Sequence, residues 1–573
     1  MITLIIQQVG LNCSKIISNP RRRAGRAAWA PVRLRRRRTP ARPAPARGPV
    51  AAGPGGGRSR AGSDILIDGR AALPPRIPRA MIAKRFRTRS AAGAATLLLA
   101  ASLGIPARAA LTRPARITFD PAGVLVVDGQ KKFPLTLTIV PGPDARAPNG
   151  RPAYAEFADS GVLFMRSGGP AWNDDTISRE HAMQAAAAAS GLRCCPWLGW
   201  DLSNFSPGDA NREARLRTVI AAFKDSPGMG LWKGADEPDW SNAHNPAQAT
   251  PEQVAHVARL LRELDPAHPI WLVQAPRGTA ASLRRYDAGW DVGGMDIYPV
   301  SYPPGVHTEG KNKELSMVGD FTRLMKRVAG EKPFWMTLQI AFSGVVKPGR
   351  TLRFPTFPEQ RFMAYEAIIN GARGLTYFGG GLPQTLNSRD QPLGFNWTYF
   401  DRVMRPLFAE LGPRSPLLPA LLAPDAGLKL SVAPEAPPRR ALARKEEEQN
   451  LPAPSPPRLV RDEAGADARA IECLVRQAGD DYYVLACKKE GPTVHVRFRG
   501  LPPEIHGAGA GAVLFEEPRK VDAQHGSFAD WFGPFEVHVY HFAASRKAGR
   551  DGEAAPAGPE PLPSAPESRP PRL

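Results

Sequence analysis

Cysteine is scarce in this sequence, with five among 573 residues, which excludes a small scaffold held together by disulfides. Only Cys473 and Cys487 have a spacing that suggests pairing, because they flank a predicted hairpin at equal distances from its turn. A disulfide between them and two free thiols both remain open. No cluster of Cys and His residues has the spacing of a metal site. The sequence therefore predicts no metal and no other cofactor.

Long apolar runs are also missing. No stretch reaches the roughly 20 apolar residues of a transmembrane helix, so no membrane span is predicted. The apolar segment 91–105 is shorter, follows basic residues at 84–89, and precedes Ala107-Arg108-Ala109. This order is typical of an export signal. We therefore expect residues 81–109 to be a signal peptide that is cleaved near Ala109, which gives a secreted or periplasmic protein.

Acidic residues are almost absent from the N-terminal part. Residues 1–109 contain 22 of the 76 Lys and Arg residues but only two of the 54 Asp and Glu residues. Of the net charge of +22, +20 (22 − 2) therefore arises there, and nucleic acid is not expected to be a partner of the mature protein. We interpret residues 1–80 as a disordered basic extension and expect Met81 to be the true start. A disordered arm that binds nucleic acid is the alternative.

From residue 110 onward, apolar segments alternate with segments of helical periodicity. The predicted strands are 135–140, 161–165, 192–198, 230–234, 270–274, 292–297, 334–339 and 374–378. Helix starts and 3.6-residue periodicity are clearest in 251–265 and 358–372. Eight such units over ~290 residues predict an α/β fold, a (β/α)8 TIM barrel at 110–431. A doubly wound sheet is the alternative, but no Gly-rich phosphate loop follows the first strand.

The remainder of the chain has a different composition. Residues 432–460 are Pro-rich and charged, which predicts a linker. Residues 461–545 contain short alternating strands with turns, which predict a small all-β antiparallel sandwich. Residues 546–573 are rich in Pro and Ala and are predicted to be a disordered tail.

Polar and aromatic residues gather where the predicted strands end. These residues are Arg166, Trp172, Trp200, Asp201, Asp236, Glu237, Trp240, Gln274, Asp296, Tyr298, Gln339 and Tyr377. In a barrel, the C-terminal ends of all strands meet at one face, where active sites lie. Carboxylates, Trp and Tyr around one opening suit a sugar, whose apolar faces stack on rings while its hydroxyls bond acids and amides.

These motifs resemble the clan-A (β/α)8 glycoside hydrolases, loosely the β-galactosidase and cellulase barrels, which often carry a C-terminal β-domain. The resemblance rests on "VDGQKKFPLTLT" before the first strand, Arg166 after the second, "DEP" after the fourth, Tyr298 after the sixth, and "GARGLTYF" on the eighth. It covers roughly 117–542 and implies hydrolysis of a carbohydrate, with Glu237 as general acid/base.

The surroundings of Glu237 agree with that role. Burial among Trp232, Trp240 and Asp236 would raise its pKa, as proton donation to a glycosidic oxygen requires. The alternative is that residues 236–239 cap the next helix, because acids favour helix N-termini. Asp236 and Asp296 are predicted to be catalytic as well. The other residues at the strand ends are predicted to bind substrate, although Arg166 would also suit an ion pair with a barrel carboxylate.

Gln339 departs from the clan pattern, in which a nucleophilic Glu ends the seventh strand. A neutral amide cannot form the glycosyl ester, so three outcomes remain open. Asp296 is the favoured catalytic partner of Glu237, and a separation of ~6.5–9.5 Å would mean inversion through a water. Asp236 would otherwise orient an N-acetyl group of the substrate, as in family-20-type hexosaminidases. Lastly, the barrel would bind carbohydrate without catalysis.

Overall fold

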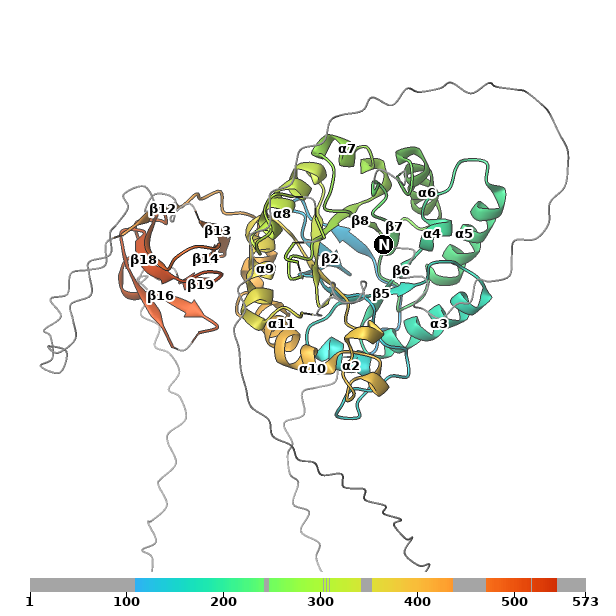
Figure 1. The fold of residues 1–573 in the computed structure, drawn as a ribbon, viewed down its shortest axis with the longest axis horizontal. Coiled ribbons are helices and arrows are strands. Elements are labelled where there is room, and N and C mark those ends of the chain that lie inside the picture. The colour runs from blue at the N-terminus through green and yellow to red at the C-terminus, as the bar shows by residue number, and fades with distance from the viewer. Residues whose placement is uncertain are drawn as a thin grey trace, which may run out of the picture. The chain divides into compact units, whose positions relative to one another are not determined.

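The computed structural model describes residues 109–241, 247–301, 303–305, 307–308, 310–341, 353–435, 470–516 and 518–543. The predicted basic extension, the signal peptide up to residue 108, most of the predicted linker and the C-terminal tail lie outside these residues. Within the described part, a closed (β/α)8 barrel precedes an antiparallel all-β domain, as predicted (Figure 1). None of the helices described there is long and apolar enough to cross a membrane.

Eight parallel strands close the barrel in chain order, with β11 pairing β4. They are β4 (Leu135–Leu137), β5 (Phe164–Gly168), β6 (Arg193–Trp197), β7 (Trp232–Asp236), β8 (Ile270–Gln274), β9 (Val292–Asp296), β10 (Phe334–Gln339) and β11 (Leu375–Phe378). All eight predicted strands are present. The second and fourth run two or three residues further toward the C-terminus than predicted, which moves Arg166 and Asp236 inside their strands.

Helices surround these strands (Figure 1). They are α2 (Ala153–Asp159), α3 (Asp174–Ala189), α4 (Gly199–Leu202), α5 (Ala210–Phe223), α6 (Pro251–Leu264), α7 (Ala280–Arg284), α8 (Met317–Ala329), α9 (Phe357–Ile369), α10 (Trp397–Tyr399), α11 (Arg405–Leu411) and α12 (Leu418–Leu422), with the 3-10 helices η1 (Asp287–Gly289), η2 (Pro383–Thr385) and η3 (Gln391–Leu393) and the π-helix η4 (Phe400–Met404). Helices α6 and α9 begin at capping boxes formed by Thr250 and Thr356, which satisfy backbone N–H groups of the first turn.

Side chains along each strand alternate between the barrel interior and the surrounding helices. The interior contains an apolar layer in which Phe164 and Trp271 pack against Trp335, with ring centroids 6.0 Å apart in both pairs. A small sheet of β1 (Ile117–Phe119), β2 (Leu125–Val127) and β3 (Gln130–Lys132) packs onto this layer. The polar inward positions nearer the carboxyl ends of the strands are therefore the ones available for chemistry.

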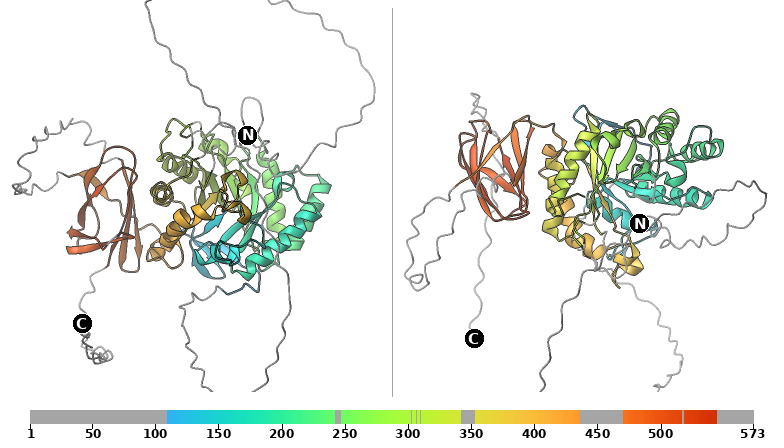
Figure 2. Two further views of the ribbon diagram at one scale, coloured as in Figure 1. Left: turned by 60° about the horizontal axis from the view of Figure 1, so that its bottom comes forward. Right: turned by 45° about the horizontal axis from the view of Figure 1, so that its top comes forward.

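The C-terminal domain is one antiparallel sheet that encloses its own apolar core (Figure 2). Its strands are β12 (Ser431–Pro434), β13 (Ile471–Ala478), β14 (Asp481–Lys488), β15 (Val494–Arg499), β16 (Gly507–Leu514), β17 (Lys520–Gln524), β18 (Ser527–Phe532) and β19 (Val537–Phe542). β12 pairs with β15. The residues after position 431 that we assigned to a linker therefore begin with a strand of this domain.

The candidate disulfide does not form. Cys473 and Cys487 are both free thiols. In the β13–β14 hairpin, Cys473 lies opposite Ala486, whereas Cys487 lies opposite Glu472. This offset of one residue places the two side chains on opposite faces of the sheet, so the equal spacing about the turn does not bring their sulfur atoms together.

Candidate functional site

An ion-pair network lies at the carboxyl end of β7. The Lys233 ammonium is 2.9 Å from Oδ1 of Asp236, and the Arg166 guanidinium, from β5, is 3.9 Å from Oδ2. Lys233 is only 1% exposed and also donates to the carbonyl of Ala235. Burial would raise the pKa of Asp236, but Lys233 and Arg166 outweigh it and lower the pKa below its usual value. Asp236 is therefore a carboxylate at neutral pH.

Glu237 has an unusual backbone conformation. Its φ of 48° is rare for a residue with a side chain and costs conformational energy. Two backbone hydrogen bonds stabilise this conformation. The N–H of Glu237 donates to the carbonyl of Val273 at 2.8 Å, and the N–H of Trp240 donates to the carbonyl of Glu237 at 2.9 Å. Helix α6 starts only at Pro251 and is capped by Thr250, so the Asp-Glu pair does not cap it.

Glu237, after β7, faces Asp296 at the end of β9, which is separated from β7 by the single strand β8. Carboxyl oxygens of the two residues and a ring nitrogen of His307 all lie within 4.8 Å of one another. Burial raises the pKa of Glu237 to about 7, and the charge of Asp236 adds to this shift. Burial, followed by the charge of Glu237, also raises the pKa of Asp296 well above its usual value. Two carboxyl groups this close resist ionising together, so the pair keeps a proton more readily than an isolated carboxyl group does.

This distance bears on the mechanism that the sequence left open for Asp296. An inverting pair of carboxyl groups lies ~6.5–9.5 Å apart, because a water molecule must fit between one carboxylate and the sugar. The separation of at most 4.8 Å between Glu237 and Asp296 is shorter than that range. The wider separation that would have meant inversion through a water is therefore absent, and Asp296 as the catalytic partner of Glu237 stays a prediction.

The same three groups have atoms close enough to hold one metal ion. Arg277 and Lys233 carry positive charges that favour the ionised form of Glu237, and such charges oppose a divalent cation at the same place. Burial, with the charge of Arg277 adding to it, lowers the pKa of His307 to about 3, so its imidazole is neutral. We assign the cluster to proton chemistry.

Aromatic rings line the neighbourhood of these carboxyl groups. Tyr298, two residues after Asp296, stacks on Phe378 with centroids 5.4 Å apart and lies 4.4 Å from the ring of His307. Its side chain is buried, and burial raises the pKa of its hydroxyl well above the usual value. Tyr298 is therefore a neutral hydroxyl beside Asp296.

Two arginine–tryptophan pairs lie at the strand ends. Arg277 lies over the ring of Trp240, and Arg166 lies over the ring of Trp197, at 5.4 and 5.2 Å from the ring centroids. Trp200 meets Trp197 edge to face at 5.0 Å. Trp200, Trp240 and Arg166 all remain partly exposed, as contact with a ligand requires.

Gln339 has a role that its position alone did not indicate. Its amide oxygen accepts a hydrogen bond from the N–H of Val300 at 2.8 Å, and its amide N–H donates to the carbonyl of Val300 at 2.7 Å. The side chain is completely buried. Both ends of the amide are hydrogen-bonded to one backbone residue, so Gln339 holds the loop after β9. It does not contact substrate, and our prediction of that contact is wrong.

Two further predicted contacts point away from the barrel interior. Gln274 is completely buried, and its amide N–H is 3.5 Å from the carbonyl of Leu283 in α7. Tyr377 is also fully buried and packs against Phe408 of α11, with centroids 5.3 Å apart. Both predictions of substrate contact are wrong because alternation along a strand sends every second side chain outward.

Two tryptophans near the strand ends belong to the core. Trp172 is 3% exposed and donates through its indole N–H to the carbonyl of Trp197. Asp201 accepts from the backbone N–H of Trp172 at 3.1 Å and so anchors this loop. Trp232 is fully buried against the helices and donates to Asp265. Trp172 therefore presents no ring face to a ligand, and Trp232 does not wall Glu237.

Sequence reasoning missed four residues of the site. Lys233 is a charged residue inside a buried strand, which is a detectable pattern, because an unpaired lysine is rarely buried. Phe378 could have been found from side-chain alternation along its strand, because the alternation that turns Tyr377 outward turns its neighbour Phe378 inward. His307 and Arg277 lie on connections between strands and helices, where no periodicity places a side chain.

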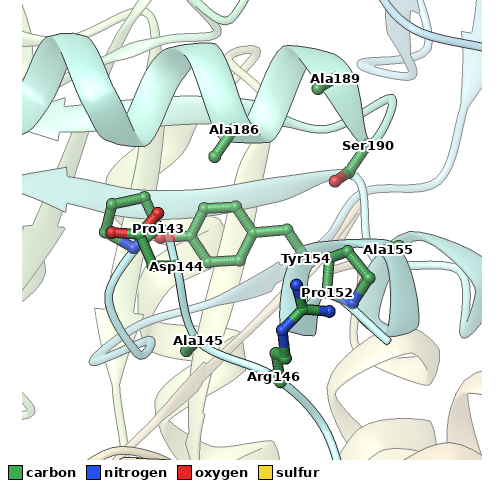
Figure 3. Close-up of a pocket in the computed structure, with 10 residues that line it drawn as sticks. All are labelled: Pro143, Asp144, Ala145, Arg146, Pro152, Tyr154, Ala155, Ala186, Ala189 and Ser190. Atoms are coloured by element: carbon green, nitrogen blue, oxygen red, sulfur yellow. The ribbon is translucent and has the colours of Figure 1, made fainter. Parts of the chain in front are cut away.

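A cavity of about 420 Å³ lies elsewhere, beside the connection from β4 to α2 and the end of α3 (Figure 3). The ring of Tyr154 lies along it, and the Tyr154 hydroxyl donates to the carbonyl of Pro141 at 2.9 Å. None of the candidate residues lines it, and we assign no function to it.

No protein-family model matches this sequence, and no curated protein sequence is similar to it. The fold is similar to solved structures described as a glycoside hydrolase (13% identity, TM-score 0.48, covering 75% of this chain and 97% of that chain) and a glycoside hydrolase family 5 from Bacteroides vulgatus (13%, 0.45, 77% and 96%). It is also similar to an Anoxybacillus alpha-amylase (9%, 0.42, 75% and 99%). At these identities, function has to be argued from the site itself.

Proposed function

We propose that this protein is an exported glycoside hydrolase, with Glu237 as general acid/base and Asp296 as the second catalytic carboxylate. One observation carries the proposal. The partly exposed carboxyl group of Glu237, just after β7, and the buried one of Asp296, at the end of β9, have oxygens within 4.8 Å of each other, and the pKa of each group is raised. A proton donor beside a carboxylate is what cleavage of a glycosidic bond needs.

The steps follow from the two groups. Glu237 gives its proton to the glycosidic oxygen as the bond from that oxygen to the anomeric carbon breaks. Asp296 attacks the anomeric carbon and forms a glycosyl ester. A water molecule then attacks the same carbon, releases Asp296 as a carboxylate, and returns its proton to Glu237. Tyr298, next to Asp296, is positioned to donate a hydrogen bond to that carboxylate.

This assignment predicts the stereochemical outcome. Carboxyl oxygens of the two groups lie within 4.8 Å of each other, so the pair falls below the ~6.5–9.5 Å of inverting enzymes and nearer to the ~5–5.5 Å of retaining ones. We therefore expect the first product to keep the anomeric configuration of the substrate. Proton NMR of the anomeric signals in the first minutes of hydrolysis measures this, before mutarotation mixes the anomers. A product of opposite configuration would rule out Asp296 as nucleophile.

The pH dependence supplies a second test. The protonated form of Glu237 is the active acid, so activity should fall as pH rises through about 7. Arg277 favours the ionised form of Glu237; removing its charge in Arg277→Gln therefore raises the pKa, and the alkaline limb of kcat/KM should move to higher pH. Arg285→Gln, on the exposed end of α7, is the matched control and should leave the limb in place.

Asp236 is assigned to electrostatics and not to an N-acetyl group. Its two oxygens face Lys233 and Arg166, so neither is directed to an amide of the substrate. Its negative charge instead raises the pKa of Glu237. This arrangement does not favour the substrate-assisted mechanism of hexosaminidases, and activity on aryl glycosides without an N-acetyl group tests the choice.

A barrel that only binds carbohydrate is the second candidate. The observation that favours it is Gln339, whose bonded amide stands where clan-A hydrolases carry a nucleophile. A panel of aryl glycosides and oligosaccharides separates the two. Hydrolysis by wild type that Glu237→Gln loses supports the enzyme. Equal inactivity of both proteins, with oligosaccharide binding by both, supports the binding barrel.

A further inference from the structure

Trp531 is an exception among the described residues. Its side chain is 49% exposed, and it is the one large hydrophobic side chain of that part of the chain that is exposed to this degree. It lies on β18 directly opposite His495 of β15. The two rings lie 4.8 Å apart with an angle of 33° between their planes. A neighbouring strand thus supports the exposed ring on the sheet surface.

The surrounding surface is polar. Arg497 and Arg499 of β15 lie opposite Ala529 and Ser527 of β18, on the same face as Trp531 because every second residue of a strand shares a face. Arg497 forms an ion pair with Glu435 and donates to the hydroxyl of Ser527. The alternate residues of both strands, including Phe498, Phe528 and Phe532, fill the core of the domain.

The other half of this sheet has a different environment. Tyr483 and Leu485 of β14 and Val539 of β19 belong to the same apolar cluster as residues of helix α9. Their outer face is covered by the barrel helices, whereas the surface around Trp531 is not covered by described residues. Among the described residues, an exposed aromatic ring is therefore found only on the half of the sheet with β15 and β18.

We propose that this face of β15 and β18 is a second carbohydrate-binding site, in which a pyranose ring stacks on Trp531. A stable protein interface buries about 800 Å² on each partner around several large apolar anchors, and a single indole on a polar sheet is too small for that. A sugar needs one ring to cover its apolar face and polar groups beside it for its hydroxyls, and the Arg497–Glu435 pair and Ser527 supply them. Such a site would hold a glycan chain near the barrel, which is a binding function in addition to hydrolysis.

The test uses the full chain with Glu237→Gln, so that the glycan is not consumed. Binding to soluble xylan, mixed-linkage β-glucan and polygalacturonate is measured by titration calorimetry. We expect Trp531→Ala to weaken binding to at least one polymer by ten-fold or more, and Trp531→Phe to weaken it less because a ring remains. Arg402→Ala, an exposed change on η4, should have no effect. In the wild-type background, Trp531→Ala should leave kcat/KM on aryl glycosides unchanged.

Other outcomes overturn the proposal. They are equal affinities of the parent and Trp531→Ala proteins for all three polymers, absence of binding to any of them, or a self-association that Trp531→Ala abolishes. The last would assign the face to a second copy of this chain. If binding depends on Trp531 but the protein cleaves no glycoside, only the proposal of hydrolysis in the barrel fails. Failure of the two proposals can therefore be told apart.

Discussion

Glu237→Gln should lower kcat for a glycoside with a poor leaving group by about 10²–10⁴-fold, the usual contribution of a general acid. The amide keeps the size and hydrogen-bonding capacity of the side chain but has no proton to give. KM should change little, because the carboxyl group acts mainly in the transition state. Steady-state kinetics of both proteins measure this effect.

Leaving groups and a surface control make the result specific. Aryl glycosides whose phenols leave readily need little protonation of the leaving oxygen. For these substrates, Glu237→Gln should slow cleavage of the glycosidic bond much less. Glu263→Gln, the same chemical change at an exposed position of α6 that pairs with Arg259, should retain full activity. An equal loss of kcat/KM, which reports cleavage of the glycosidic bond, with good and poor leaving groups would mean that Glu237 is not the proton donor.

Gln339→Glu tests whether a carboxylate placed at the end of the seventh barrel strand restores a nucleophile there. A carboxylate at this position would face the carbonyl of Val300 without a proton to donate, and both groups are buried. We expect the free energy of unfolding to fall by about 2–4 kcal/mol and activity to decrease, not to increase. Urea denaturation and assays on the aryl glycoside panel measure the two effects.

The control for this change is Gln253→Glu. Gln253 is the third residue of α6 and closes its capping box with Thr250, and Glu serves equally well at that position. Its unfolding free energy should therefore stay within about 0.5 kcal/mol of wild type. A Gln339→Glu protein that is as stable as wild type and more active would show that the amide is not a structural clamp.

Much of the architecture follows from sequence pattern. Alternating apolar and helical segments predicted all eight barrel strands, because strand and helix have different periods that the sequence displays locally. The neighbourhood of Arg166, Asp236, Glu237, Asp296 and Tyr298 also followed, since the carboxyl ends of parallel strands meet at one face of a barrel. Their catalytic roles remain predictions.

Several of the errors share one physical cause. Side chains alternate along a strand, so a boundary that is uncertain by one residue leaves the facing of the terminal side chain undecided. Gln274 and Tyr377 face the helices although the predicted ends of their strands match the structure, because the bounds of a strand alone do not fix which face each residue takes. Cys473 and Cys487 lie on opposite faces through the same kind of offset, in the pairing of two strands.

The sequence by itself determined the barrel, the antiparallel domain after it, and an Asp-Glu pair at the end of the fourth barrel strand. Only the tertiary structure decided that Asp296 lies within 4.8 Å of Glu237, that Lys233 keeps Asp236 ionised, and that Gln339 is bound to Val300. These facts depend on pairs of residues far apart in the chain. Their distances, and the pKa values that depend on burial and nearby charge, exist only once the barrel has closed.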